Sequence, residues 1–253
     1  MKILISPLSL EEARIVAEGG CDILDIKNVK EGSLGAQFPW VIQEVVSAFK
    51  NDGMICSATL GDLPQKPGTA SLAAFGAAKC GVNYVKAGLY GSKTYEDALE
   101  MMQNIQRAVR LVSEDILVVA SGYADYRRFG GVSSDEVVAA ARDSKCDVVM
   151  LDTAIKDGQT LIDNMPLDAI RKFVNSGHDA GLHVALAGSI TEADIEDLAS
   201  IGPDIIGVRG AVCDKNDRTS GITLERVKRF MKFCGNFASE SNELRTRLAA
   251  VAK

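Results

Sequence analysis

Short runs of apolar residues alternate along the chain with longer stretches in which apolar residues recur every three or four positions. The short runs are typical of β-strands buried on both faces, and the longer stretches are typical of amphipathic helices. One helix is expected over residues 9–20, where Ser9 and Glu12 have capping-box spacing, and another over residues 93–110. Eight strands are expected, over residues 3–6, 22–27, 54–59, 83–88, 116–121, 147–152, 183–188 and 204–209.

This alternation predicts a single closed parallel (β/α)8 barrel, a TIM barrel, over residues 1–235. The alternative is a doubly wound sheet, which usually has fewer strands and often carries a glycine-rich nucleotide fingerprint. No such fingerprint follows a strand in this sequence. Residues 236–253 exceed the barrel pattern. Leu244, Leu248 and Val251 form a narrow apolar stripe there, so we expect a C-terminal helical extension that packs on the outer helices or on a neighbouring subunit of a homo-oligomer.

Charge and composition narrow the range of partners. The chain has 253 residues and a formal net charge of −6, which argues against nucleic acid and against an anionic membrane surface. It has neither a membrane-spanning apolar stretch nor the features of a signal peptide, so a cytoplasmic protein is expected. The six cysteines and two histidines show no ligand spacing. We therefore expect buried, reduced thiols and no metal or other cofactor.

Charged residues recur near the ends of the predicted strands. The second, fourth, sixth and eighth strands begin alike, with G-C-D, G-V-N, K-C-D and G-P-D, which indicates a weak internal repeat of two βα units. The charged residues all lie an odd number of positions after the Asp or Asn that ends each of these motifs. Because side chains alternate between the two faces of a strand, the charges share one face of the sheet. That face is the barrel interior, at the carboxyl ends where barrel active sites form. The residues concerned are Asp25, Lys27, Lys86, Asp152 and Arg209.

The lysines suggest amine chemistry. Asp25 and Lys27 form either a structural ion pair or a carboxylate that orients a reactive amine. Burial and the neighbouring cations Lys86 and Lys156 would lower the pKa of Lys27, and a neutral lysine can form a Schiff base with a carbonyl compound. Lys86 could be the nucleophile, a phosphate clamp or a proton acceptor. Lys156 follows the sixth strand in a loop, so it could equally be a surface charge.

The turns after the seventh and eighth strands read A-G-S-I-T (187–191) and V-R-G-A-V (208–212), and they suit a phosphate site. The alternative is ordinary turn and helix-cap chemistry. Glycine- and proline-rich loops over residues 30–40 and 61–69 are typical of lids. The phosphate candidates are Gly188, Ser189, Arg209 and Gly210, and further rim candidates are Asp62, Lys66, Tyr123 and Asp125.

Together these motifs resemble the (5-formylfuran-3-yl)methyl phosphate synthase family of methanofuran biosynthesis, also described as 4-(hydroxymethyl)-2-furancarboxaldehyde-phosphate synthase. The resemblance covers residues 1 to about 235 and rests on D-I-K-N-V-K-E-G-S-L-G-A (25–36), S-A-T-L-G-D (57–62), K-P-G-T (66–69), V-K-A-G-L-Y-G (85–91), G-Y-A-D (122–125), M-L-D-T-A-I-K-D-G (150–158), A-L-A-G-S-I (185–190) and V-R-G-A (208–211).

This resemblance implies an enzyme that condenses two molecules of glyceraldehyde 3-phosphate to one furan phosphate, with loss of phosphate and water and without a cofactor. It places the family's Schiff-base lysine at Lys27 and its proton acceptor at Lys86, and it matches Asp25, Asp152 and Lys156 to the other active-site charges.

Two other functions stay open. D-I-K resembles the D-x-K-x-x-D signature of orotidine-phosphate-type decarboxylases, but Lys30 stands where the third member would be Asp. A non-catalytic sugar-phosphate-binding barrel is the other, although such a protein has no need of Asp25 and Lys27 beneath Lys86.

Overall fold

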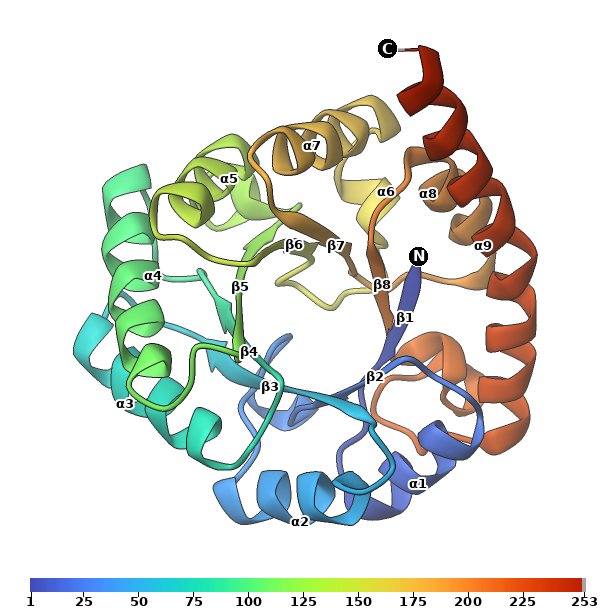
Figure 1. The fold of residues 1–253 in the computed structure, drawn as a ribbon, viewed down its shortest axis with the longest axis horizontal. Coiled ribbons are helices and arrows are strands. Elements are labelled where there is room, and N and C mark those ends of the chain that lie inside the picture. The colour runs from blue at the N-terminus through green and yellow to red at the C-terminus, as the bar shows by residue number, and fades with distance from the viewer. Residues whose placement is uncertain (252–253) are drawn as a thin grey trace.

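The computed structural model of the chain describes the backbone of residues 1–251 and the side chains of residues 1–237. Within these residues eight parallel strands close into a barrel in sequence order, and β8 pairs with β1. Figure 1 shows the strands around the centre and the helices outside them. The strands are β1 (Lys2–Ile5), β2 (Ile23–Ile26), β3 (Ile55–Asp62), β4 (Tyr84–Gly88), β5 (Leu117–Tyr123), β6 (Val148–Asp152), β7 (His183–Leu186) and β8 (Ile205–Val208).

The predicted TIM barrel is thus confirmed, and each expected strand is present with its ends shifted by a few residues at most. The α-helices are α1 (Leu10–Glu18), α2 (Pro39–Phe49), α3 (Pro67–Lys79), α4 (Tyr95–Arg110), α5 (Ser134–Asp143), α6 (Leu161–Asn164), α7 (Leu167–Asp179), α8 (Ile195–Ile201) and α9 (Leu224–Val251). Short 3₁₀ turns are η1 (Val29–Glu31), η2 (Tyr126–Arg128), η3 (Glu192–Asp194), η4 (Gly210–Val212) and η5 (Asp214–Asn216).

The start of α1 differs from the predicted capping box in an informative way. Ser9 caps the helix, since its hydroxyl accepts a hydrogen bond from the Glu12 backbone N–H at 3.3 Å. The Glu12 carboxylate does not return to Ser9. It accepts from the Leu8 N–H at 2.8 Å and binds Arg209 instead. Of the two capping-box interactions, only the one at the Ser9 hydroxyl is present, and Glu12 instead forms an ion pair that joins α1 to the loop after β8.

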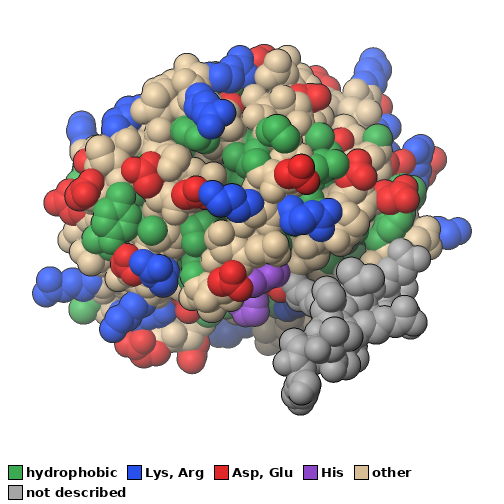
Figure 2. All heavy atoms as spheres, turned by 90° about the horizontal axis from the view of Figure 1, so that it is seen from above, with side chains coloured by type: hydrophobic (Ala, Val, Ile, Leu, Met, Phe, Trp, Pro, Cys, Tyr) green, Lys and Arg blue, Asp and Glu red, His purple; other side chains and the backbone are tan. Residues whose placement is uncertain are grey.

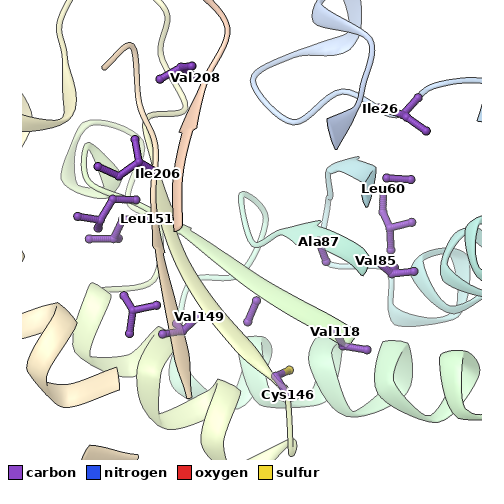
Figure 3. Close-up of a cluster of buried hydrophobic side chains, with 14 of the residues drawn as sticks. Ile26, Leu60, Val85, Ala87, Val118, Cys146, Val149, Leu151, Ile206 and Val208 are labelled. Carbon is purple, nitrogen blue, oxygen red and sulfur yellow. The ribbon is translucent and has the colours of Figure 1, made fainter. Parts of the chain in front are cut away.

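Two apolar layers hold the barrel together. Strand residues that point outward, among them Val85, Val118 and Leu151, pack against the surrounding helices (Figure 3). A second, smaller cluster fills the amino-terminal part of the barrel interior, and it contains Leu4, Ile23, Val119, Val148, Met150, Ala185, Ala187 and Ile205. The interior cluster closes the barrel below the level of the charged residues, so the pocket opens only toward the carboxyl ends of the strands.

Helix α9 continues past the predicted end of the barrel domain. It runs as one helix from Leu224 to Val251, with Val227, Phe230 and Cys234 buried against the barrel. The boundary between residues 235 and 236 falls inside this helix, and the division into a barrel and an extension stays a prediction. The apolar stripe of Leu244, Leu248 and Val251 lies outside the side chains that the structure describes.

All six cysteines are buried and unpaired, as the sequence predicts, and burial raises the pKa of Cys21 and Cys146 to about 12. Figure 2 shows one side of the molecule, on which acidic and basic side chains are interspersed. None of the helices in the described part of the chain has the length and apolar character of a membrane span.

Candidate active site

A pocket of about 340 Å³ opens at the carboxyl ends of the strands, within the size range of small-molecule sites. Its walls are built by strand alternation, because the residue two positions beyond an apolar interior side chain points into the same space. All nine predicted site residues line this pocket: Asp25, Lys27, Lys86, Asp152, Lys156, Gly188, Ser189, Arg209 and Gly210.

Asp25 is fully buried, and three neighbouring side chains donate hydrogen bonds to its carboxylate. Its carboxylate accepts hydrogen bonds from Ser6 Oγ at 3.0 Å, Ser57 Oγ at 2.9 Å and Lys86 Nζ at 2.8 Å. Burial alone would raise the pKa of Asp25, but the cations Lys86 and Lys27 outweigh it and the pKa lies below its usual value. The ion pair at this level is therefore Asp25–Lys86 across two strands, and not Asp25–Lys27 along one.

Lys27 differs from the other two lysines. It is 8% exposed, and its amine has neither a hydrogen bond nor an ion pair with any residue whose side chain the structure describes. Burial lowers its pKa from 10.5 to about 7, with Asp152 and Asp25 opposing the shift and Lys86 adding to it. A substantial fraction of Lys27 is then the neutral amine near neutral pH, which is the form of a lysine that can act as a nucleophile.

Asp152 and Lys156 form a second pair. Lys156 Nζ donates to Asp152 Oδ1 at 2.7 Å and to Thr153 Oγ1 at 3.0 Å. Burial would raise the pKa of Asp152, but Lys156 and Lys27 lower it below the usual range. Lys156 lies in a loop, as the sequence indicates, yet that loop brings its amine into the pocket and away from the surface.

The loop that carries Lys156 is held by Asp125, which sequence analysis placed at the rim. Its carboxylate accepts from the backbone N–H groups of Ala154 and Ile155, both at 2.8 Å. Asp125 is buried and does not line the pocket. Its contribution is to fix the position of the loop after β6.

Asp62 and Tyr123 have a similar holding role. The Tyr123 hydroxyl donates to Asp62, and the same carboxylate accepts from the backbone N–H groups of Ser33 at 2.7 Å and Leu34 at 3.3 Å. The loop after β2, predicted as a lid, is thereby tied to β3 and β5. Neither Asp62 nor Tyr123 lines the pocket, and Lys66 is exposed at the start of α3, away from it.

The turn after β7 lines the pocket and contains backbone N–H groups without a described hydrogen bond. Gly188 and Ser189 adopt positive φ, at 115° and 51°, which turns the chain sharply. Among the described hydrogen bonds, none is donated by the backbone N–H of Ser189 or Ile190. Thr191 does cap the following turn, so the helix-cap alternative applies to that residue. The free N–H groups are the donors that an anion would use.

Arg209 is a different case. Its guanidinium donates to the carbonyl oxygens of Ser6 and Ser220 and to both Glu12 oxygens, while Nε donates to the Arg218 carbonyl oxygen at 2.7 Å. An arginine has five N–H donors, and all five are in use here. The predicted anion clamp therefore touches the pocket wall but has no donor left for a ligand.

Sequence reasoning missed three residues of the site, of which Ser6 and Arg218 line the pocket and Ser57 lies behind Asp25. Ser6 and Ser57 hold Asp25, and both follow the same inward alternation as the charges, which is a signal that could have found them. Arg218 also lines the pocket, but it lies in the irregular loop after β8, where no periodicity indicates which way a side chain points.

The fold and this pocket define a (β/α)8-barrel enzyme whose site is lined by lysine amines and carboxylates. The chain belongs to the 4-HFC-P synthase family, whose sequence model matches residues 3–231. Relatives named (5-formylfuran-3-yl)methyl phosphate synthase include that of Methanocaldococcus jannaschii, 51% identical over 92% of this chain and 100% of the relative. That of Methanobrevibacter smithii is 48% identical over 94% of this chain and 100% of the relative. The family predicted from the motifs is confirmed.

Solved structures with the same fold are more distant in sequence. The 3-hexulose-6-phosphate synthase of Salmonella typhimurium is 15% identical, with a TM-score of 0.66 over 94% of this chain and 100% of that one. The phosphoribosyl anthranilate isomerase of Thermus thermophilus is 14% identical, with a TM-score of 0.59 over 93% and 99%. These likenesses support the barrel architecture.

Proposed function

We propose that the enzyme condenses two molecules of glyceraldehyde 3-phosphate to (5-formylfuran-3-yl)methyl phosphate, with loss of phosphate and water, through a Schiff base on Lys27. The product would enter methanofuran-type cofactor biosynthesis. The observation that carries the proposal is the state of Lys27. Its amine is buried, unpaired among the described residues and close enough to Asp25 and Asp152 for both to influence its pKa.

The charged neighbours suit the steps of such a reaction. The neutral Lys27 amine would attack the carbonyl carbon of one triose phosphate to give a carbinolamine. Lys86, held as an ammonium ion by Asp25, would protonate the departing hydroxyl group, which leaves as water. The resulting iminium ion acidifies the adjacent C–H bond, and the Lys86 amine, now neutral, would accept that proton.

The enamine formed in this way would attack the aldehyde of the second triose phosphate, and ring closure and eliminations would follow. Asp152 and Lys156 form the other proton-exchanging pair in the pocket, so we assign them to the hydroxyl groups that leave in these later steps. In each of these steps, the proton would come from the side chain that lies within hydrogen-bond distance of the departing hydroxyl group.

The decarboxylase alternative finds less support. A D-x-K-x-x-D site needs a second carboxylate at position 30, but Lys30 occupies it and is exposed outside the pocket. A non-catalytic binding barrel would gain nothing from Lys27, because burying an amine without a partner costs stability and the binding of a sugar phosphate does not require it.

Two measurements test the proposal together. Incubation with glyceraldehyde 3-phosphate should produce the absorbance of a furan aldehyde, with a product mass that matches the furan phosphate. Reduction with borohydride during turnover should add a triose-derived mass to the peptide that contains Lys27. Lys27→Met should abolish both signals, while Lys30→Met, which removes an exposed lysine three residues away, should leave both unchanged.

Adduct formation on Lys86 or Lys156 in place of Lys27 would overturn the assignment of the nucleophile. Absence of any furan from the wild-type enzyme, with intact folding by circular dichroism, would overturn the proposed reaction.

A further inference from the structure

Apart from Lys27, Arg218 is the one cation lining the pocket that has no carboxylate partner among the described side chains. Asp25 is paired with Lys86 and Asp152 with Lys156, while Arg209 is neutralised by Glu12. Within the described side chains, Arg218 forms no ion pair, and its one hydrogen bond runs from Nη2 to the Gly32 carbonyl oxygen at 3.0 Å. Its remaining N–H donors have no acceptor among the residues that the structure describes.

The surroundings of Arg218 make a ligand the natural partner. The side chain is half-buried, and burial lowers its pKa, with Asp152 and Asp62 opposing this and Arg209 adding to it. Asp62 lies too far away for an ion pair, and its oxygens already accept from Ser33, Leu34 and Tyr123. A guanidinium group partly removed from water and left with free donors is best satisfied by an anion with two or more acceptor oxygens.

The position of Arg218 is fixed from two sides. Arg209 Nε holds the backbone carbonyl of Arg218, which ties its loop to β8. Gly32, whose carbonyl oxygen accepts from Arg218, is also held in place, because the next two residues, Ser33 and Leu34, donate backbone hydrogen bonds to Asp62. Gly32 has φ of 130°, and a Cβ there would stand 2.1 Å from Asp62 Oδ2, so only glycine fits. The Arg218 guanidinium therefore bridges the loops after β2 and β8 above Lys27.

The turn after β7, which lines the pocket together with Arg218, indicates that the anion is a phosphoryl group. Ser189 and Ile190 line the same pocket, and their backbone N–H groups donate no described hydrogen bond. Free backbone N–H groups in a positive-φ turn are a typical binding site for tetrahedral oxyanions. A guanidinium fork together with backbone donors matches a phosphate monoester in shape and charge. The two sets of donors lie on different elements, which leaves room for phosphoryl groups at more than one point of the rim.

We propose that Arg218 binds a phosphoryl group of the substrate at the mouth of the pocket and so aims its carbonyl carbon at Lys27, while Arg209 only holds the loop that carries Arg218. This rests on the proposed triose phosphate reaction for the identity of the substrate. Recognition of the phosphoryl group itself does not depend on that reaction.

The test compares Arg218→Gln and Arg218→Lys with Arg127→Gln. Arg127 is exposed on the same rim and outside the pocket, so its replacement causes the same loss of charge without touching the site. For each protein, inorganic phosphate binding is measured by calorimetry, and trapping on Lys27 with cyanoborohydride is measured for glyceraldehyde and for glyceraldehyde 3-phosphate. Thermal unfolding checks that each variant is folded.

A charged hydrogen-bonded contact of this type corresponds to roughly ten- to a hundred-fold in affinity. Arg218→Gln should weaken phosphate binding and raise the KM for glyceraldehyde 3-phosphate by about that factor, and Arg218→Lys should fall between it and the wild type. Trapping of unphosphorylated glyceraldehyde should be unchanged. Arg127→Gln should match the wild type throughout.

Equal phosphate affinity in Arg218→Gln and Arg127→Gln would overturn the inference. So would an equal loss of trapping with both aldehydes, because Arg218 would then act on Lys27 and not on phosphate. If the wild type makes no furan but binds phosphate through Arg218, the proposed reaction fails and this inference stands.

Discussion

The inner face of the barrel has two levels that are built by the same strands and are chemically opposite. At the lower level Leu4, Ile23 and Met150 pack together as an apolar plug. Two residues further along the same strands stand Ser6, Asp25 and Asp152, which line the pocket. One step of strand alternation therefore separates the apolar part of the interior from the charged part to which we assign the chemistry.

The two levels differ in what burial does to them. Burying the apolar plug is favourable in proportion to its area. Burying charges is costly, and the upper level limits the cost by pairing Lys86 with Asp25 and Lys156 with Asp152. Lys27 is left out of these pairs, and burial acts on it by lowering its pKa. The amine to which we assign the Schiff base is thus the one lysine of the pocket that has no carboxylate partner among the described residues.

The largest effect is expected from a variant that prevents proton transfer at the upper level but keeps its charge, because this tests whether the upper level carries the chemistry. Lys86→Arg keeps a cation opposite Asp25, but arginine does not release a proton near neutral pH. We expect furan formation to fall by about two to four orders of magnitude, the usual contribution of general acid–base catalysis. Single-turnover kinetics with glyceraldehyde 3-phosphate would measure this.

Lys93→Arg is the matched control for that variant, because Lys93 is exposed on the rim over the rings of Tyr90 and Phe129. It should retain full activity. If Lys86→Arg retained it as well, Lys86 would be a binding cation and not a proton carrier.

The lower level should show the reverse behaviour. Ile205→Ala removes apolar contacts from the plug, and we expect the free energy of unfolding to fall by about 2–5 kcal/mol, with Ile205→Val costing about 0.5–1.5 kcal/mol. Trapping of substrate on Lys27, normalised to folded protein, should change little in either variant. Urea unfolding followed by circular dichroism would give the energies. A large loss of trapping without a loss of stability would show that the two levels are not separable.

The pH dependence of trapping tests the electrostatics of Lys27 directly. Its pKa of about 7 means that the neutral amine decreases about tenfold per pH unit below 7 and dominates above it. The rate of adduct formation should therefore rise with pH and level off above pH 7. Asp152 favours the charged form of Lys27, so Asp152→Asn should move the midpoint to lower pH. A midpoint near 10 in the wild type would contradict the described environment.

The sequence was sufficient for features that depend on periodicity. Strand alternation alone predicts that Asp25, Lys27, Lys86 and Asp152 lie on the inner face, and all four line the pocket in the structure. It could not tell which carboxylate pairs with which lysine, since the Asp25–Lys86 contact joins residues on different strands.

Features that depend on loop conformation were beyond the sequence. Arg209 has the right position for a phosphate clamp, but Glu12, a residue near the other end of the chain, takes up its donors. Arg218 lies in a loop whose path is set by hydrogen bonds to that same Arg209. Neither fact leaves a trace in local residue patterns, because the first arises from a contact between segments far apart in the sequence and the second from a loop without a periodic structure.

The smallest effect on the chemistry is expected at the far end of the chain. The relative from Methanocaldococcus jannaschii is matched over its whole length by 92% of this chain, and the family model ends at residue 231. Phe237 is partly buried against the core and its ring lies 5.4 Å from that of Phe233, and it is the last residue whose side chain the structure describes. Removal of residues 238–253 should leave trapping on Lys27 unchanged and lower the Tm by about 2–4 °C, or change the oligomer seen by light scattering. Removal of residues 236–253 also takes away Phe237 and should lower the Tm further. If both truncations matched the full chain in Tm and in assembly, the extension would have no part in the stability of the barrel or in subunit contacts.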